Sequence, residues 1–169
     1  MKMIRTGLCL LVASAAAPAW AAPAALLNKS ITVSYATTIP GKTADGTQVT
    51  GTRQSTRTIY ISSAGRIFAR VARRDGRASE TKDRAPGDNS YRFVGDKLVG
   101  VMQFQSGASQ MTISFDPSGQ SCSASIVAGR DSGQAIRWKM VDGSVREATG
   151  APTFSNISCS IVSGNAFGG

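Results

Sequence analysis

Residues 58–70 read Thr58-Ile59-Tyr60-Ile61-Ser62-Ser63-Ala64-Gly65-Arg66-Ile67-Phe68-Ala69-Arg70. Polar and apolar residues alternate on both sides of the small residues 63–65, which is typical of two half-buried β-strands. The three small residues suit a hairpin loop with Gly65 in the left-handed conformation. This part of the sequence therefore predicts a β-hairpin.

The loop also fixes the register of the hairpin, because it places Ser62 opposite Arg66. One face then carries the pairs Ile61–Ile67, Ile59–Ala69 and Arg57–Val71, and the other carries Tyr60–Phe68 and Thr58–Arg70. A shift of one residue would mix the two sets. We therefore expect this register alone.

Short alternating runs recur between Gly, Asp-Gly and Ser-rich breaks, and no helical stripe of apolar residues follows residue 21. The predicted strands are 30–36, 47–52, 57–62, 66–72, 91–95, 97–105, 109–115, 122–129, 134–141 and 156–162. We expect an all-β domain, an antiparallel meander that closes as a calycin-like up-and-down barrel. The alternative is a two-sheet β-sandwich. Polar loops are expected near 37–46 and 74–90.

The first 21 residues predict a secretory signal peptide. Two positive charges precede a short apolar run, and Ala19-Trp20-Ala21 fits the small-x-small cleavage pattern. The run is shorter than the roughly 20 apolar residues that cross a bilayer, and no second such run follows. We expect a single domain over 22–169 in the periplasm or outside the cell, without a membrane span once the signal is removed.

Two cysteines, Cys122 and Cys159, stay in the mature chain. In an oxidising compartment such a pair favours a disulfide, and two thiols without histidine are too few to hold a metal ion. Each cysteine alternates with aliphatic residues, so both sulfurs should point inward. We predict a structural disulfide that closes the loop between them.

The chain of 169 residues contains no histidine. This excludes Ser/His/Asp and Cys/His catalytic arrangements and histidine-dependent metal sites. No nucleophile-elbow, phosphate-loop or calcium-loop motif is present. We expect neither an enzyme nor a bound cofactor or metal.

Positive charge is concentrated in one part of the chain. The formal net charge is +9, and residues 53–92 hold ten basic and four acidic residues. Arginine suits anion binding, because its planar guanidinium donates two parallel hydrogen bonds to an oxyanion. The hairpin should gather the arginines at its open end, and the candidate anion-binding residues are Arg53, Arg57, Arg70, Arg73, Arg74 and Arg77. The competing interpretation is a solvated charged face that serves solubility.

An exported protein with this cluster would meet an acidic polysaccharide, lipopolysaccharide or an acidic protein, whereas export argues against nucleic acid. Two other functions stay open. A closed barrel could carry a small apolar ligand, provided that the interior around Met102, Phe104 and Trp138 is hollow. An enzyme would need two converging carboxylates. The oligomeric state is left open.

Three segments carry a resemblance: the Y-I-S-S-x-G-R hairpin of 60–66, the Ser-Cys-Ser run of 121–123 and the cysteine strand near the C-terminus. In these the chain resembles uncharacterised exported β-rich proteins of Gram-negative bacteria. The resemblance implies a periplasmic or secreted β-domain and assigns no activity to any residue.

Overall fold

The predicted hairpin forms, with the predicted register. In the computed structural model, β2 (Gln48–Ile61) pairs with β3 (Ile67–Asp75), and Ile61 lies opposite Ile67. Gly65 has a φ of 74°, and the Ser62 amide donates to the Arg66 carbonyl over 2.9 Å. The structure describes residues 21–84, 91–104, 107–128 and 137–167. The predicted signal peptide therefore lies outside the described residues, apart from Ala21.

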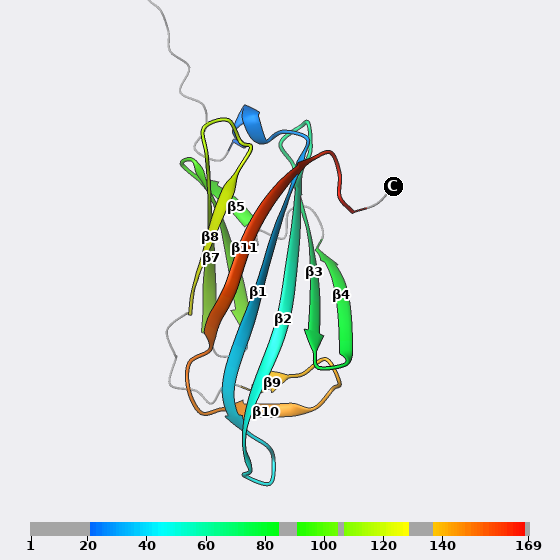
Figure 1. Ribbon diagram of the computed structural model, residues 1–169, viewed down its shortest axis with the longest axis vertical. Coiled ribbons are helices and arrows are strands. Elements are labelled where there is room, and N and C mark those ends of the chain that lie inside the picture. Colours follow the sequence, from blue (N-terminus) through cyan, green and yellow to red (C-terminus); the bar gives the residue numbers. More distant parts are fainter. Residues whose placement is uncertain (1–20, 85–90, 105–106, 129–136, 168–169) are drawn as a thin grey trace, which may run out of the picture.

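Antiparallel strands in two sheets build the domain, which confirms the predicted all-β class (Figure 1). The first sheet is strongly curled and has the order β4-β3-β2-β1-β10-β9, with β11 also paired to β1. Its other strands are β1 (Lys29–Lys42), β4 (Ala78–Arg84), β9 (Arg137–Lys139), β10 (Val145–Ala148) and β11 (Thr153–Ser163). Within the described ranges no helix has the length and apolar character needed to cross a membrane.

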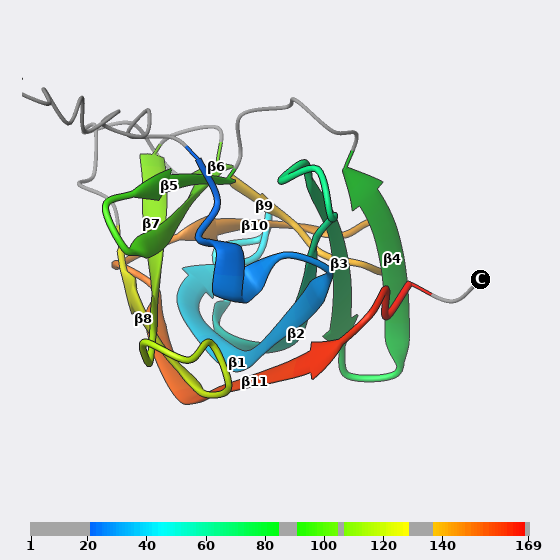
Figure 2. The same cartoon turned by 90° about the horizontal axis from the view of Figure 1, so that it is seen from above.

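The second sheet has the order β5-β6-β7-β8, with β5 (Tyr91–Val94), β6 (Lys97–Phe104), β7 (Gly107–Phe115) and β8 (Cys122–Val127). Seen from above, it faces the concave side of the curled sheet (Figure 2). β8 lies beside β11 without belonging to the same sheet, and the Cys122–Cys159 disulfide joins the two strands. The predicted disulfide is thus present. The arrangement is a half-barrel covered by a second sheet.

The hydrophobic core fills the space between the two sheets at one end of the domain. Its fully buried side chains come from both sheets and from the short 3-10 helix η1 (Ala24–Leu26) that precedes β1: Leu26, Ile31, Val33, Ile59, Ile61, Phe93, Leu98, Met111 and Ile113. Burial of this apolar surface is the main stabilising contribution to such a fold. The carrier hypothesis depends on Met102, Phe104 and Trp138. The structure describes the strands that contain these residues but not their side chains.

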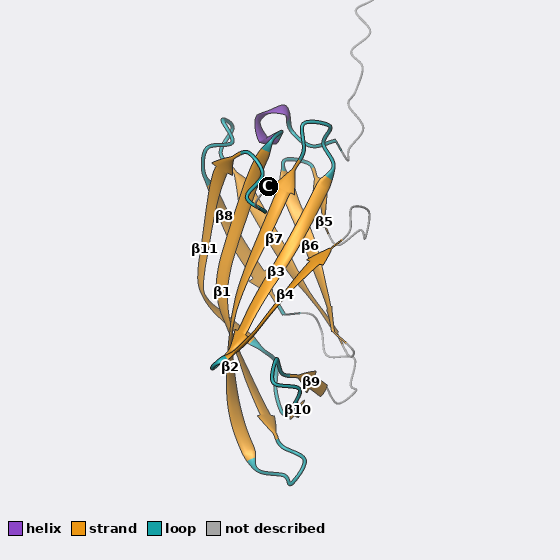
Figure 3. Cartoon of the chain, turned by 90° about the vertical axis from the view of Figure 1, so that its right-hand side faces the viewer, coloured by secondary structure: helices purple, strands orange, loops and turns teal. Residues whose placement is uncertain are grey.

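Two predicted loops are partly wrong. β1 runs to Lys42, so most of the segment near 37–46 is strand, and β1 and β2 form a long hairpin that extends beyond the second sheet (Figure 3). In the segment 74–90, residues 78–84 form β4, which pairs with β3 through the two-residue loop Gly76-Arg77. The rest of that loop, 85–90, lies outside the described residues. An edge strand bonds to one neighbour only, so polar residues can form it.

Candidate anion-binding site

Strand alternation divides the arginine cluster between the two faces of the curled sheet. Arg53 and Arg57 share the concave face of β2 with Ile59 and Ile61, and Arg73 joins them from β3 opposite Ser55. Arg70 and Arg74 lie on the convex face, and Arg77 is exposed in the β3–β4 turn. The six arginines therefore do not form one cluster, and the expectation that they gather at a single end is corrected.

Arg53 is engaged inside the half-barrel by a carboxylate. Its Nε and Nη2 each donate to Asp75 over 2.8 Å, and both side chains are more than nine-tenths buried. The Asp75 carboxylate also accepts the Val141 amide over 2.7 Å, and Arg53 donates to the Lys139 carbonyl over 3.2 Å. This pair ties β2 and β3 to β9 and to the turn that follows it.

Electrostatics within the pair follow from these bonds. Burial alone would raise the pKa of Asp75, but the hydrogen bonds from Arg53 and Val141 outweigh it and the pKa lies below its usual value. The hydrogen bond with Asp75 raises the pKa of Arg53. The pair is therefore fully ionised at neutral pH. Its arginine is occupied and its charge neutralised.

Two further arginines of the cluster also have acidic partners. Arg73 donates to Glu80 over 3.1 Å, and these residues lie directly opposite each other on β3 and β4. Arg70 donates to both carboxylate oxygens of Asp83 on the convex face, and its guanidinium stacks on the Phe167 ring with 5.0 Å to the centroid. The Arg70–Asp83 pair is exposed and adds little stability, whereas the Arg73–Glu80 pair is half-buried. Both pairs reduce the charge that these arginines offer to a partner.

Arg57 differs from the others because two tyrosine hydroxyls, not a carboxylate, surround its guanidinium. Nε donates to Tyr35 Oη over 2.8 Å and Nη1 to Tyr91 Oη over 3.1 Å, and the residue is 5% exposed. Tyr35 packs edge-on against Phe154, with ring centroids 6.0 Å apart. The Tyr91 ring lies over Gly100, where a Cβ would stand 2.5 Å from it. Both tyrosines are thus held in place by packing.

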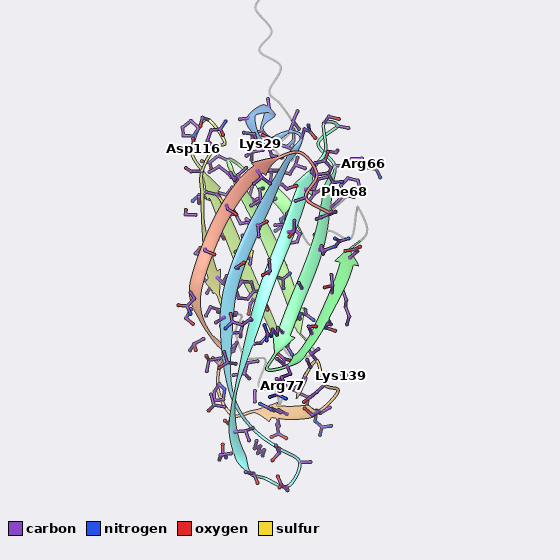
Figure 4. All side chains as sticks on the ribbon, turned by 45° about the vertical axis from the view of Figure 1, so that its right-hand side comes forward. Lys29, Arg66, Phe68, Arg77, Asp116 and Lys139 are labelled. Atoms are coloured by element: carbon purple, nitrogen blue, oxygen red, sulfur yellow. A yellow bond between two sulfur atoms is a disulfide. The ribbon has the colours of Figure 1, made fainter. Side chains whose placement is uncertain are left out.

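At the end of the domain that holds the β3–β4 turn, exposed cations surround the Arg53–Asp75 pair. Arg74 precedes this aspartate in β3, Arg77 follows it in the β3–β4 turn, and Lys139 comes from β9, whose backbone Arg53 contacts. Figure 4 shows Arg77 and Lys139 at this end, opposite to Arg66. We call the exposed side chains of Arg74, Arg77 and Lys139 the basic end. Within the described part of the chain, none of the three has a carboxylate within 4.0 Å.

Sequence reasoning missed two cations that the fold brings to this end. Lys139 belongs to a predicted strand, but its place beside Asp75 depends on contacts between residues more than sixty positions apart. Arg146 points into the concave face, where a Cβ on Gly51 would stand 2.6 Å from its Nη1. No local pattern marks either residue. Only the docking of the β9–β10 hairpin reveals them.

A surface pocket of about 530 Å³ lies between the turn of the long β1–β2 hairpin and the β9–β10 hairpin. Its lining includes Lys42 and Glu147, which form an ion pair over 3.0 Å, and Arg137 from β9. The acidic residue neutralises one of the two cations, so the pocket is less basic than the neighbouring basic end. Among the described residues no three His, Cys, Asp or Glu side chains are grouped so that they could hold a metal ion.

Fold and site together define an all-β domain, a half-barrel covered by a second sheet, with a basic surface at one end and a buried arginine within. Comparison of the chain with protein-family models, curated protein sequences and solved structures found no match.

Proposed function

We propose that the protein is an exported, non-enzymatic binding domain whose basic end recognises an anionic polymer outside the cytoplasm. An acidic polysaccharide is the first candidate, and lipopolysaccharide and acidic proteins are its alternatives. The observation that carries the proposal is the use of Asp75. Its carboxylate is turned inward to Arg53 and Val141, so it does not neutralise the cations that flank it.

The geometry supports a repetitive partner over a small one. Arg74, Arg77 and Lys139 project from two separate hairpins, and all three are exposed. Cations spread in this way suit a chain of spaced negative charges, whereas a small anion needs donors that converge on one point. Attraction between exposed charges is screened by salt, so binding should weaken steeply as the salt concentration rises.

A matched pair of double variants tests the proposal. R77S/K139S removes one arginine and one lysine from the basic end, and R66S/K97S removes the same two residue types from exposed positions elsewhere. On a heparin column R77S/K139S should elute at a clearly lower salt concentration than the wild type, and R66S/K97S should elute close to the wild type. Equal losses in both variants would show that net charge alone drives retention and would overturn the proposal.

A pull-down of the mature protein from envelope extracts at low and high salt then separates the partner classes. Retention of lipopolysaccharide or of an acidic protein, in place of polysaccharide, would support the basic end as the binding surface and would identify a different partner for it. The single variant R74S changes the third residue of the basic end. On the heparin column it should elute at a salt concentration between those of R77S/K139S and the wild type.

A further inference from the structure

Arg57 is a buried cation in an apolar row of the half-barrel. It lies opposite Val33 on one side and Val71 on the other, and its neighbour on the same face of β2 is the fully buried Ile59. Burial of a charge in such surroundings is unfavourable unless a partner of opposite charge accompanies it. The surroundings of Arg57 therefore call for an anion.

The described residues supply no such anion. The concave face carries the carboxylates of Asp75 and Glu80, and these are bound by Arg53 and Arg73. The acceptors of Arg57 among the described residues are the neutral hydroxyls of Tyr35 and Tyr91. A guanidinium has five N–H donors, so donors remain for an additional acceptor.

We propose that Arg57, which is held in place by its hydrogen bonds to Tyr35 and Tyr91, forms an internal binding site for one oxyanion group, a carboxylate or a phosphate, of a small molecule. The planar guanidinium offers parallel donors to two oxygens of such a group. The hydrogen bonds to Tyr35 and Tyr91, whose rings are positioned by Phe154 and Gly100, fix the orientation of the guanidinium. This site is separate from the basic end and differs in chemistry, since its donors converge and are shielded from water.

Thermal unfolding of the mature protein tests the site. A ligand that binds only the folded state raises the melting temperature with its concentration. Sodium acetate and sodium phosphate, each compared with sodium chloride at equal ionic strength, should raise the melting temperature of the wild type. The arm with the larger shift identifies the carboxylate or the phosphate as the preferred group.

Variants connect the shift to Arg57. R57M should show no shift with either anion, while its melting temperature in chloride should equal or exceed that of the wild type, because an uncompensated buried charge has been removed. R57K keeps the charge and loses the planar fork, so its shift should be smaller than that of the wild type. If R57M does not fold, R57K answers the same question.

Two controls make the result decisive. R77S/K139S should keep the full anion-dependent shift, so failure of the basic end and failure of this site are distinguishable. D88N and D131N change the two acidic residues that lie outside the described ranges. Absence of an anion-dependent shift in the wild type would overturn the proposal, and a lower melting temperature of D88N or D131N would then identify an internal counter-ion for Arg57.

Discussion

Arg53 and Asp75 lie directly opposite each other on β2 and β3, and two parallel hydrogen bonds of 2.8 Å join them inside the half-barrel. They are 22 residues apart in the chain, and the same carboxylate accepts the Val141 amide from the turn between β9 and β10. One buried ion pair thus joins the β2–β3 hairpin to the β9–β10 hairpin at the end where the exposed cations gather.

Removal of one partner of this pair should be strongly destabilising. D75N leaves the Arg53 charge buried and should lower the free energy of unfolding by about 3–5 kcal/mol, measured by urea denaturation. D83N, which breaks the exposed pair with Arg70 on the convex face, is the matched control and should leave stability nearly unchanged. Similar losses in the two variants would contradict the central role of Asp75.

Acid should weaken the protein through the same carboxylate. The pKa of Asp75 is lower in the folded protein than its usual value, which the unfolded chain regains. The pair therefore stabilises the fold at a pH above about 4, and this contribution is lost as the pH falls through the folded pKa. Urea denaturation at about pH 5 and about pH 3 should show a larger loss for the wild type than for R53M/D75L, which lacks both charges. Equal pH dependence would contradict this assignment.

The Cys122–Cys159 bond should matter more than a disulfide within one sheet, because no shared sheet holds β8 to β11. C122A/C159A should lose about 3–4 kcal/mol of stability in the chain-entropy model. Unfolding of the wild type with and without a reductant should reproduce this difference. An unchanged denaturation midpoint after reduction would show that side-chain packing alone holds β8 against β11.

Tyr91 depends on the absence of a side chain at residue 100. G100A places a methyl group 2.5 Å from the ring and should cost about 1–3 kcal/mol of stability. G51A is the contrasting control. Its methyl group meets the end of the flexible Arg146 side chain, which can move away. Chemical denaturation should therefore separate the two variants, and G100A should also reduce the anion-dependent shift that depends on Tyr91.

The hairpin of residues 58–70 could be predicted in full, because alternation and a glycine loop fix its register. β4 could not be predicted by the same means. Apart from Ala78 its residues are all polar, so it shows no alternation of polar and apolar residues. The signal available in the sequence was the pair Asp75-Gly76, which is typical of a tight hairpin turn, and the structure has Gly76 at a φ of 59°.

The arginines show the same limit at the site. Alternation in the predicted hairpin already places Arg57 on the face of Ile59 and Arg70 on the other face. Arg53 lies between two predicted strands, and its place on the face of Ile59 follows only from the continuous strand β2. The partners of each arginine do not follow from the sequence. Phe154 and Lys139 come from distant strands of the same sheet, and Tyr91 comes from the second sheet, so their approach depends on long-range strand pairing and on how the two sheets pack.

β2 carries the isoleucines of the core and the arginines of the concave face on one ribbon with a single alternation. An insertion of one residue between Arg57 and Ile59 would turn Arg53 and Arg57 outward while the isoleucines keep their places, and the domain could still fold. Evolution could therefore switch off the charged half of this strand by a change of length alone, with every amino-acid type in it preserved.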